Sequence, residues 1–156
     1  NAMDLKSANI KDGGKIAKEQ AYLACGGKNL SPQLSWDGAP AGTKSYALTL
    51  IEPDVKPAGK SRWIVINIPP LVTSFAKGRV AGLPAFTIMS DFGSASYAGP
   101  CPDRFSGKHR YQFAIWALGT DAVSIAPDSK TSEVLAALAK AAIAKATLNG
   151  TYERLF

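Results

Sequence analysis

The chain has a single histidine, His109, and Arg110 and Tyr111 follow it directly. Upstream, Gly99-Pro100-Cys101-Pro102 predicts a rigid turn, because proline fixes φ and glycine permits close backbone approach. An imidazole, a phenol and the positive charges of Lys108 and Arg110 are groups that attract and hydrogen-bond an oxyanion. The stretch therefore predicts a pocket for phosphate or carboxylate. The alternative is a structural histidine at the start of a strand.

A second group of charged residues lies between two predicted strands, residues 45–51 and 63–68. Both segments are rich in β-branched and aromatic residues, which favour strands. Glu52 and Asp54 follow the first segment, and Arg62 directly precedes the second. If these strands are neighbours, the two acids and the arginine lie at the same end of a sheet.

The two cysteines, Cys25 and Cys101, each lie beside a Gly- or Pro-rich turn. A disulfide between them would close a loop of about 76 residues, which is worth roughly 4 kcal/mol in the chain-entropy model. Two reduced thiols in a cytosolic protein are the alternative. One histidine and two cysteines at these spacings match no zinc-ligand pattern, so we expect no metal and no cofactor. A hydrolase with Cys101 as nucleophile and His109 as base is a less favoured hypothesis.

Length and composition predict one domain, residues 4–156, with a sizeable core, since the chain has 156 residues of which 46% are hydrophobic. The first three residues, Asn-Ala-Met, are typical of an expression tag remnant. No apolar run reaches the roughly 18 residues that a membrane span needs. The formal net charge of +6 comes from scattered lysines and arginines, which argues against nucleic-acid binding. Either a cytoplasmic or a periplasmic location fits.

The hydrophobic pattern favours a mainly β fold, an antiparallel-rich β-sandwich with peripheral α-helices. The glycine and proline residues in residues 78–92 predict a long excursion with at most short extended pieces. The strongest strand is predicted at residues 111–118. We further expect an opening hairpin from residues 4–9 and 15–17. An edge or irregular segment is expected at residues 31–36, with Trp36 in the core, and a short strand within residues 121–128. An amphipathic helix is expected from Thr131, as N-cap, to Ala146, with Gly150 as C-cap.

Several motifs occur in an order that resembles the phosphatidylethanolamine-binding protein family, and more narrowly its bacterial, Raf-kinase-inhibitor-like branch. They are Asn29-Leu30-Ser31-Pro32-Gln33-Leu34-Ser35-Trp36, Glu52-Pro53-Asp54, Arg62-Trp63-Ile64-Val65-Ile66-Asn67-Ile68-Pro69, Tyr97-Ala98-Gly99-Pro100-Cys101-Pro102, His109-Arg110-Tyr111 and Leu148-Asn149-Gly150-Thr151-Tyr152.

The resemblance implies a β-sandwich with a small anion-binding pocket at one end, which in the family accepts phosphate-like lipid headgroups. Family members act mostly as inhibitors, scaffolds or regulators of other proteins, so a non-enzymatic role is implied, and a homodimer is compatible with it. By position, the pocket would be lined by Glu52, Asp54, Arg62, Gly99, His109 and Tyr111.

The chain departs from the family pattern at two of these positions. Glu52 stands where the family usually has aspartate, and Arg62 stands where it has histidine. A Glu52–Arg62 ion pair would partly fill the pocket and neutralise its charge, whereas a free Arg62 would hold phosphate through two hydrogen bonds. We therefore expect a non-catalytic protein that binds an anion or phosphorylated ligand and regulates a partner. The alternative is a kinase or protease inhibitor that acts only through protein contacts and has a vestigial pocket.

Overall fold

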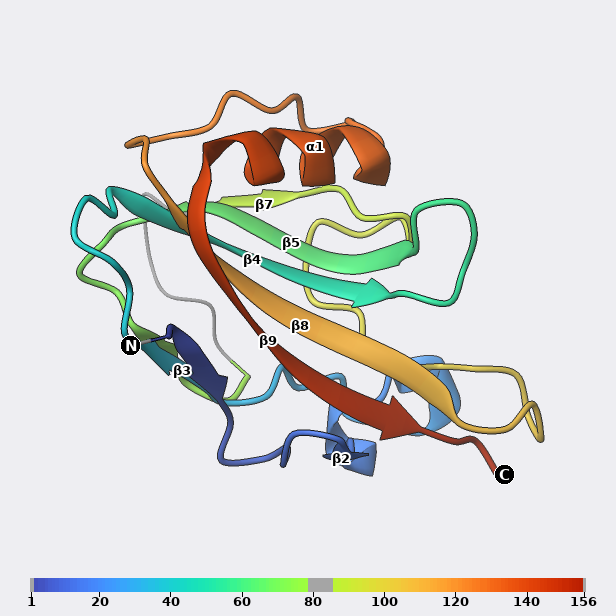
Figure 1. Ribbon diagram of the computed structural model, residues 1–156. Coiled ribbons are helices and arrows are strands. Elements are labelled where there is room, and N and C mark those ends of the chain that lie inside the picture. The colour runs from blue at the N-terminus through green and yellow to red at the C-terminus, as the bar shows by residue number, and fades with distance from the viewer. Residues whose placement is uncertain (1, 79–85, 156) are drawn as a thin grey trace.

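The computed structural model describes residues 2–78 and 86–155, which form the elements shown in Figure 1. In chain order these are β1 (Asp4–Lys6), β2 (Gly14–Lys15), the 3-10 helices η1 (Lys18–Gln20) and η2 (Leu23–Cys25), β3 (Leu34–Asp37), β4 (Ser45–Glu52), β5 (Lys60–Ile68), β6 (Ser74–Phe75), β7 (Phe86–Ile88), β8 (His109–Leu118), α1 (Thr131–Ala141) and β9 (Ala142–Tyr152).

The strands form two sheets, in the orders β2-β9-β8-β4-β5-β7 and β1-β3-β6. All neighbours are antiparallel except β2 and β9. The two sheets face each other across an aromatic core: the Trp36 ring of β3 lies 5.7 Å from the Tyr46 ring of β4, and Phe75 of β6 lies 6.2 Å from Trp63 of β5. The predicted mainly β, antiparallel-rich fold is confirmed, and Trp36 is a core residue.

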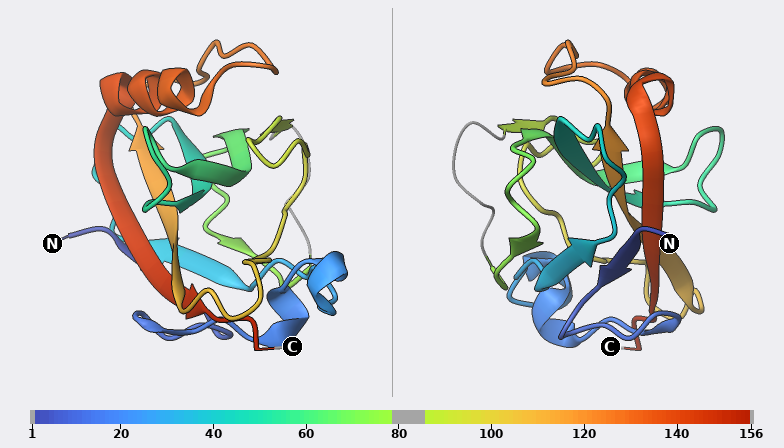
Figure 2. Two further views of the ribbon diagram at one scale, coloured as in Figure 1. Left: turned by 90° about the vertical axis from the view of Figure 1, so that its right-hand side faces the viewer. Right: turned by 60° about the vertical axis from the view of Figure 1, so that its left-hand side comes forward.

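The helix forms a third layer on the other face of the large sheet (Figure 2). Side chains of β8 alternate between the two faces, as expected for a strand buried on both sides. Phe113 and Ile115 belong to the core between the sheets, whereas Ala114 and Trp116 belong to a second cluster with Val134 of α1. None of the helices in the described residues is long and apolar enough to cross a membrane.

The predicted helix began within one residue of the observed start but was too long. Its N-cap is Lys130 rather than Thr131, and the Lys130 backbone N–H donates to Glu133 Oε1 at 3.0 Å. The helix ends at Ala141 rather than Ala146, and the chain continues directly as β9. Alanine favours helices, so the alanine-rich sequence through this junction favoured the wrong structure.

Strand pairing explains why residues 142–152 are extended. β9 runs antiparallel to β8 along its length, and Ala146 and Leu148 reach the core between the sheets. Gly150 is therefore a strand residue and not the predicted C-cap. A Cβ there would lie 2.7 Å from Ile16 Cγ1, so glycine permits close packing. Tertiary burial has overridden local helix propensity.

The N-terminal segments do not form the predicted hairpin. β1 pairs with β3 in the small sheet, and β2 pairs with β9 in the large sheet. The Gly13 N–H donates to the Asn149 carbonyl, which directs this part of the chain along β9 instead of back onto β1. Burial of Leu5 in the core holds β1 against β3.

Two other predicted extended segments also differ. Of residues 31–36, predicted as an edge or irregular segment, residues 31–33 are irregular as expected. The rest belongs to β3, which is the middle strand of the small sheet, and Pro32 lies before its first residue, Leu34, so it removes no hydrogen bond from the strand. Residues 121–128 form no strand; Val123 and Ile125 pack beside the helix from an irregular loop. Of the predicted excursion at residues 78–92, β7 is extended, and residues 79–85 lie outside the described residues.

Candidate functional site

The predicted acids, arginine and histidine meet at one end of the large sheet because of its topology. Glu52 is the last residue of β4, and His109 is the first residue of β8. β8 is antiparallel to β4 and pairs Gln112 with Ile51, so the start of β8 lies beside the end of β4. β5 borders β4 on its other side and places Arg62 next to the same end.

Arg62 is a buried structural anchor. Its side chain is 2% exposed, its Nε donates to the Ala98 carbonyl at 2.9 Å, and its Nη2 donates to the Gly99 carbonyl. Its Nη1 bonds Glu52 Oε1 at 3.1 Å, and its guanidinium carbon lies 4.5 Å from the centre of the Phe92 ring. Of the two alternatives left by the sequence, the structure has the ion pair. All three guanidinium nitrogens are engaged, so Arg62 is not a free fork for phosphate.

Glu52 lies between Arg62 and His109. Its second oxygen, Oε2, is 3.9 Å from His109 Nδ1, and its side chain is 11% exposed. On the other side of the imidazole, Nε2 lies 2.8 Å from the hydroxyl oxygen of Ser106, which itself donates to the Asp103 carbonyl at 2.6 Å. Because that hydroxyl proton is used, Nε2 is the donor to Ser106, and Nδ1 faces the carboxylate. Ser106 thus orients the imidazole, Glu52 faces its other side beyond hydrogen-bond distance, and one third of the His109 side chain remains exposed.

Asp54 and Arg110 form an exposed pair at the rim. Arg110 Nε lies 2.9 Å from Asp54 Oδ2, and Nη2 lies 2.6 Å from Oδ1, which is a two-bond arrangement. These hydrogen bonds lower the pKa of Asp54 and raise that of Arg110. The second acid near the site is therefore also matched by an arginine.

These residues surround an open pocket of about 290 Å³, lined by Glu52, Asp54, Val55, Ser106, Lys108, His109 and Arg110. Lys108 forms no ion pair with a carboxylate in the described part of the chain. With Arg62 behind Glu52 and Arg110 beside Asp54, two acids are matched by two arginines. Lys108 is therefore the one charge without a counterpart, and the site has a net charge of +1 while His109 is neutral.

Three residues of the predicted set, Arg62, Gly99 and Tyr111, are not part of the pocket lining, and Arg62 reaches the site only through its bond to Glu52. Gly99 is a packing and backbone site: its N–H donates to Asn29 Oδ1 at 2.7 Å, and a Cβ would lie 1.9 Å from the Gln20 carbonyl oxygen. Tyr111 is fully buried in the core, and its hydroxyl has no hydrogen-bond partner in residues 2–78 and 86–155. Burial, followed by the charge of Glu52, raises its pKa.

Two lining residues, Val55 and Ser106, were not predicted from the sequence, and the one that contacts His109 is Ser106. Its only sequence signal is its position three residues before His109, in a loop whose course the sequence does not specify. The Phe105 N–H donates to the Arg154 carbonyl, which anchors this loop to the segment after β9. That long-range contact places Ser106 against the imidazole.

A disulfide joins Cys25 to Cys101, with their Cα atoms 5.5 Å apart. Of the two alternatives for the cysteines, the structure has the disulfide. It ties η2 to the turn that follows Gly99, and the Tyr22 N–H donates to the Pro100 carbonyl in the same region. The segment whose carbonyls bind Arg62 is therefore also held by the disulfide, and Cys101 has no free thiol.

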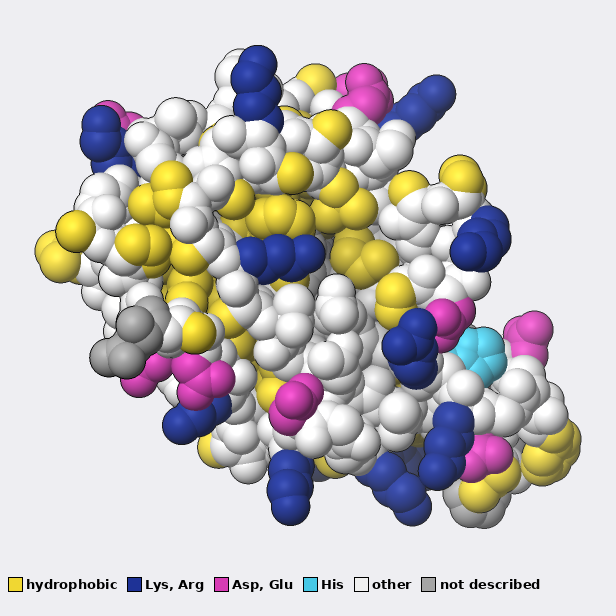
Figure 3. Space-filling view, viewed as in Figure 1, with side chains coloured by type: hydrophobic (Ala, Val, Ile, Leu, Met, Phe, Trp, Pro, Cys, Tyr) yellow, Lys and Arg dark blue, Asp and Glu magenta, His cyan; other side chains and the backbone are white. Residues whose placement is uncertain are grey.

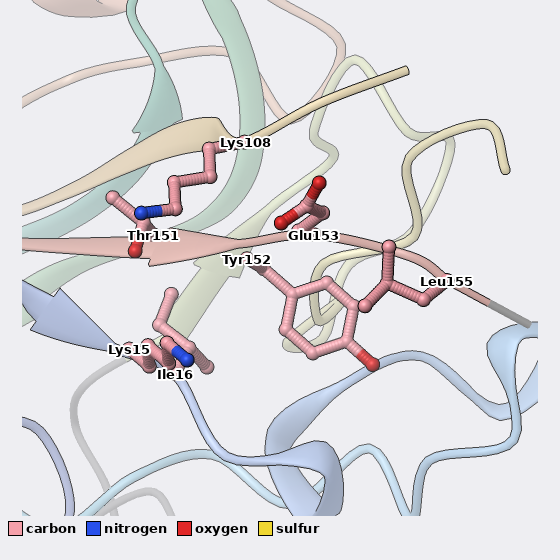
Figure 4. A pocket seen from close by; sticks show the side chains of 7 residues that line it. All are labelled: Lys15, Ile16, Lys108, Thr151, Tyr152, Glu153 and Leu155. Atoms are coloured by element: carbon pink, nitrogen blue, oxygen red, sulfur yellow. The ribbon is translucent and has the colours of Figure 1, made fainter. Parts of the chain in front are cut away.

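A smaller cavity of about 130 Å³ lies beside the end of β9 and is shown in Figure 4. Lys108 lines this cavity as well as the pocket, and the other lining residues are Lys15, Ile16, Thr151, Tyr152, Glu153 and Leu155. The two hollows therefore share one cation. No cluster of His, Cys, Asp and Glu that could hold a metal ion occurs among the described residues.

Comparison with known proteins identifies relatives that all point to the same family. Residues 6–153 match the family model described as phosphatidylethanolamine-binding protein. The chain is 36% identical to the UPF0098 protein YbcL of Escherichia coli, with 97% of this chain and 88% of YbcL covered. It is also 36% identical to a UPF0098 protein of Methanothermobacter thermautotrophicus, with 97% and 99% covered.

Solved structures agree with the sequence relatives. The crystal structure of E. coli YbcL, described as a new member of the mammalian PEBP family, has a TM-score of 0.90 at 33% identity and covers 98% of this chain and 99% of its own. A PEBP homologue from Chlamydia trachomatis has a TM-score of 0.83 at 35% identity, with 98% of each chain covered. The chain therefore belongs to the phosphatidylethanolamine-binding protein family.

Proposed function

We propose that this protein is a non-catalytic binder of small anions or phosphorylated ligands and that it acts by regulating a partner protein. One observation carries the proposal: both carboxylates of the pocket are matched by arginines, while Lys108 and His109 face the pocket without a full countercharge. The remaining charge is positive, and it increases when His109 is protonated. Such a site attracts an oxyanion and disfavours a cation.

The cationic groups at the pocket mouth fit a tetrahedral anion. Lys108 provides an ammonium group on a flexible stem, and His109, which Ser106 holds through Nε2, adds positive charge when it is protonated. Arg62 contributes indirectly, because it neutralises Glu52 from behind and so reduces the repulsion that a bare carboxylate would exert on an anion. The ligand would then be held at the rim and not in the interior.

A hydrolase is the second candidate, because Ser106, His109 and Glu52 lie in the order of nucleophile, base and carboxylate. Hydrogen-bond direction argues against it. The Ser106 hydroxyl donates to the Asp103 carbonyl, so it does not give its proton to the imidazole. Glu52 is bonded to Arg62 and lies 3.9 Å from Nδ1, too far for a hydrogen bond that would orient a base. The Cys101 alternative lacks a thiol, since that residue is in the disulfide.

A purely protein-interacting inhibitor with a vestigial pocket is the remaining alternative. The observation that favours it is the Glu52–Arg62 pair, which fills the inner end of the site with protein groups. In that case, the pocket would bind no anion and partner contacts would lie on the outer surface. Anion binding and partner regulation can therefore be tested separately.

The direct test is a titration with inorganic phosphate, followed by O-phosphoethanolamine and O-phosphoserine, monitored by NMR chemical shifts. We expect saturable shifts around Lys108 and His109, and at least tenfold weaker binding in a His109→Ala, Lys108→Gln double variant. Lys140→Gln, which removes an exposed lysine of the helix, is the matched control and should bind as the native protein does. Unsaturable binding, or equal affinity in the double variant, would refute the anion site and favour the protein-only alternative. A p-nitrophenyl acetate assay that shows Ser106-dependent turnover would refute the non-catalytic assignment.

A further inference from the structure

A second hollow, of about 360 Å³, lies on the helix-covered face of the large sheet. It is lined by Thr49, Ile51, Pro53, Ala58, Gln112, Ala114, Trp116, Leu135, Ala139 and Lys145. Figure 3 shows hydrophobic side chains gathered below the helix on this side of the molecule, with a basic side chain lying across them. Of the pocket residues above, none lines this hollow, so it is a separate site.

The hollow exists because small side chains lie between larger ones. Thr49 of β4 and Ala114 of β8 are almost fully buried and form the floor. The 11-residue helix covers only part of this face and forms one wall through Leu135. The loop after β4 forms the opposite wall, and it packs so closely that a Cβ on Gly59 would lie 2.6 Å from Ile51 Cγ2. Both walls are thus fixed by packing in the folded protein.

A single cation lies at this apolar hollow. Lys145 Nζ is 4.2 Å from the centre of the Trp116 ring, and the lysine makes no ion pair with a carboxylate within the described residues. Trp116 is held in place, because its Nε1 donates to Thr49 Oγ1 at 3.1 Å. The lining residues include no acid. The hollow therefore combines an ordered aromatic surface, aliphatic walls and one unmatched positive charge.

We propose that this hollow binds an amphipathic carboxylate, with an aliphatic or aryl body on Trp116, Ile51 and Leu135 and the carboxylate on Lys145. Ligand sites are typically concave and mostly apolar, with a few polar groups that fix orientation. The volume is within the usual range of such sites, which begins at about 300 Å³. A carboxylate would replace the weak contact of Lys145 with the indole ring by a charge-assisted hydrogen bond. An amphipathic cation of the same size would be repelled by the same lysine.

The test uses three ten-carbon probes below their micelle concentrations: decanoate, decanol and decyltrimethylammonium. Each would displace 1-anilinonaphthalene-8-sulfonate, a fluorescent apolar anion, from the native protein. We expect decanoate to displace the dye at a concentration roughly tenfold lower than the cation does, with decanol between them. Lys145→Gln should weaken decanoate roughly tenfold and leave decanol unchanged, while Lys140→Gln, outside the hollow, should change neither.

A second variant tests the site without removing a native contact. Ala139 is exposed on the helix and lines the hollow, so Ala139→Glu should fold normally and place a carboxylate at the wall. We expect it to weaken decanoate and strengthen the cation. Equal displacement by all three probes, absence of saturable dye binding, or self-association that excludes the dye in sedimentation velocity would overturn the proposal. The site is independent of the phosphate pocket, so His109→Ala should leave decanoate binding unchanged whether or not phosphate binds.

Discussion

Replacing Arg62 by methionine tests the role assigned to the buried arginine. Methionine keeps an unbranched apolar stem but removes the guanidinium, so Glu52 loses its cation and the Ala98 and Gly99 carbonyls lose their donors. Breaking a buried ion pair by removing one partner costs about 3–5 kcal/mol. Each unsatisfied buried carbonyl adds about 1–3 kcal/mol, part of which water recovers. We therefore expect a loss of about 5 kcal/mol in the free energy of unfolding.

That loss is large compared with the whole stability of a domain, which is typically about 5–15 kcal/mol. The assay is urea unfolding followed by tryptophan fluorescence, under non-reducing conditions that keep the disulfide. Arg62→Lys, which keeps the charge but cannot reach all three acceptors, should lose less and remain measurable if the methionine variant does not fold. Arg110→Met is the matched control, because it breaks an exposed arginine–carboxylate pair and should change stability little.

A double-mutant cycle with Glu52→Gln isolates the ion pair. In the double variant no carboxylate remains without its cation, so the loss should be smaller than the sum of the two single losses by about 1–3 kcal/mol. A loss below about 1 kcal/mol for Arg62→Met, or additive single losses, would refute the reasoning. Either result would mean that water already solvates Glu52 and that Arg62 does not set the charge of the pocket.

Two further predictions concern buried residues near the site. Burial raises the pKa of Tyr111 above the unfolded value of about 10, so its contribution to stability is complete below that pH and is lost as pH rises further. Because its buried hydroxyl has no partner among the described residues, Tyr111→Phe should be at least as stable as the native protein at pH 7 and decline less steeply above pH 10, whereas parallel stability curves would contradict this. Gly99→Ala should cost about 3 kcal/mol or more in urea unfolding, because its Cβ would collide with the Gln20 carbonyl; a native midpoint would show that the turn relaxes freely.

The sequence was sufficient to predict those parts of the fold in which the local residue pattern and tertiary burial favour the same structure. β4, β5 and β8 combine β-branched and aromatic residues with burial on both faces, and all three were predicted close to their observed bounds. The junction at Ala142 was not predictable in the same way, because alanine is compatible with helix and with strand. Only pairing with β8 decides between them, and that pairing depends on residues far away in the sequence.

The candidate site was also predictable only in part. The family motifs were sufficient to bring Glu52 and His109 together, since they mark the end of β4 and the start of β8. They could not decide whether Arg62 was free, because its bonds depend on two backbone carbonyls supplied by the turn at Ala98 and Gly99. Ser106 was not predictable either, because a long-range contact of its loop positions it.

The disulfide provides a test that separates stability from pocket geometry. It closes a separation of 76 residues, so a Cys25→Ser, Cys101→Ser variant should lose about 4 kcal/mol in urea unfolding. The pocket should change little, because its walls are the ends of β4 and β8, and Arg62 still holds the carbonyls of the neighbouring turn. We expect phosphate affinity within about twofold of the native value at temperatures where the variant is folded. A loss above tenfold in phosphate affinity would mean that the covalent link, and not Arg62, positions the turn behind the site.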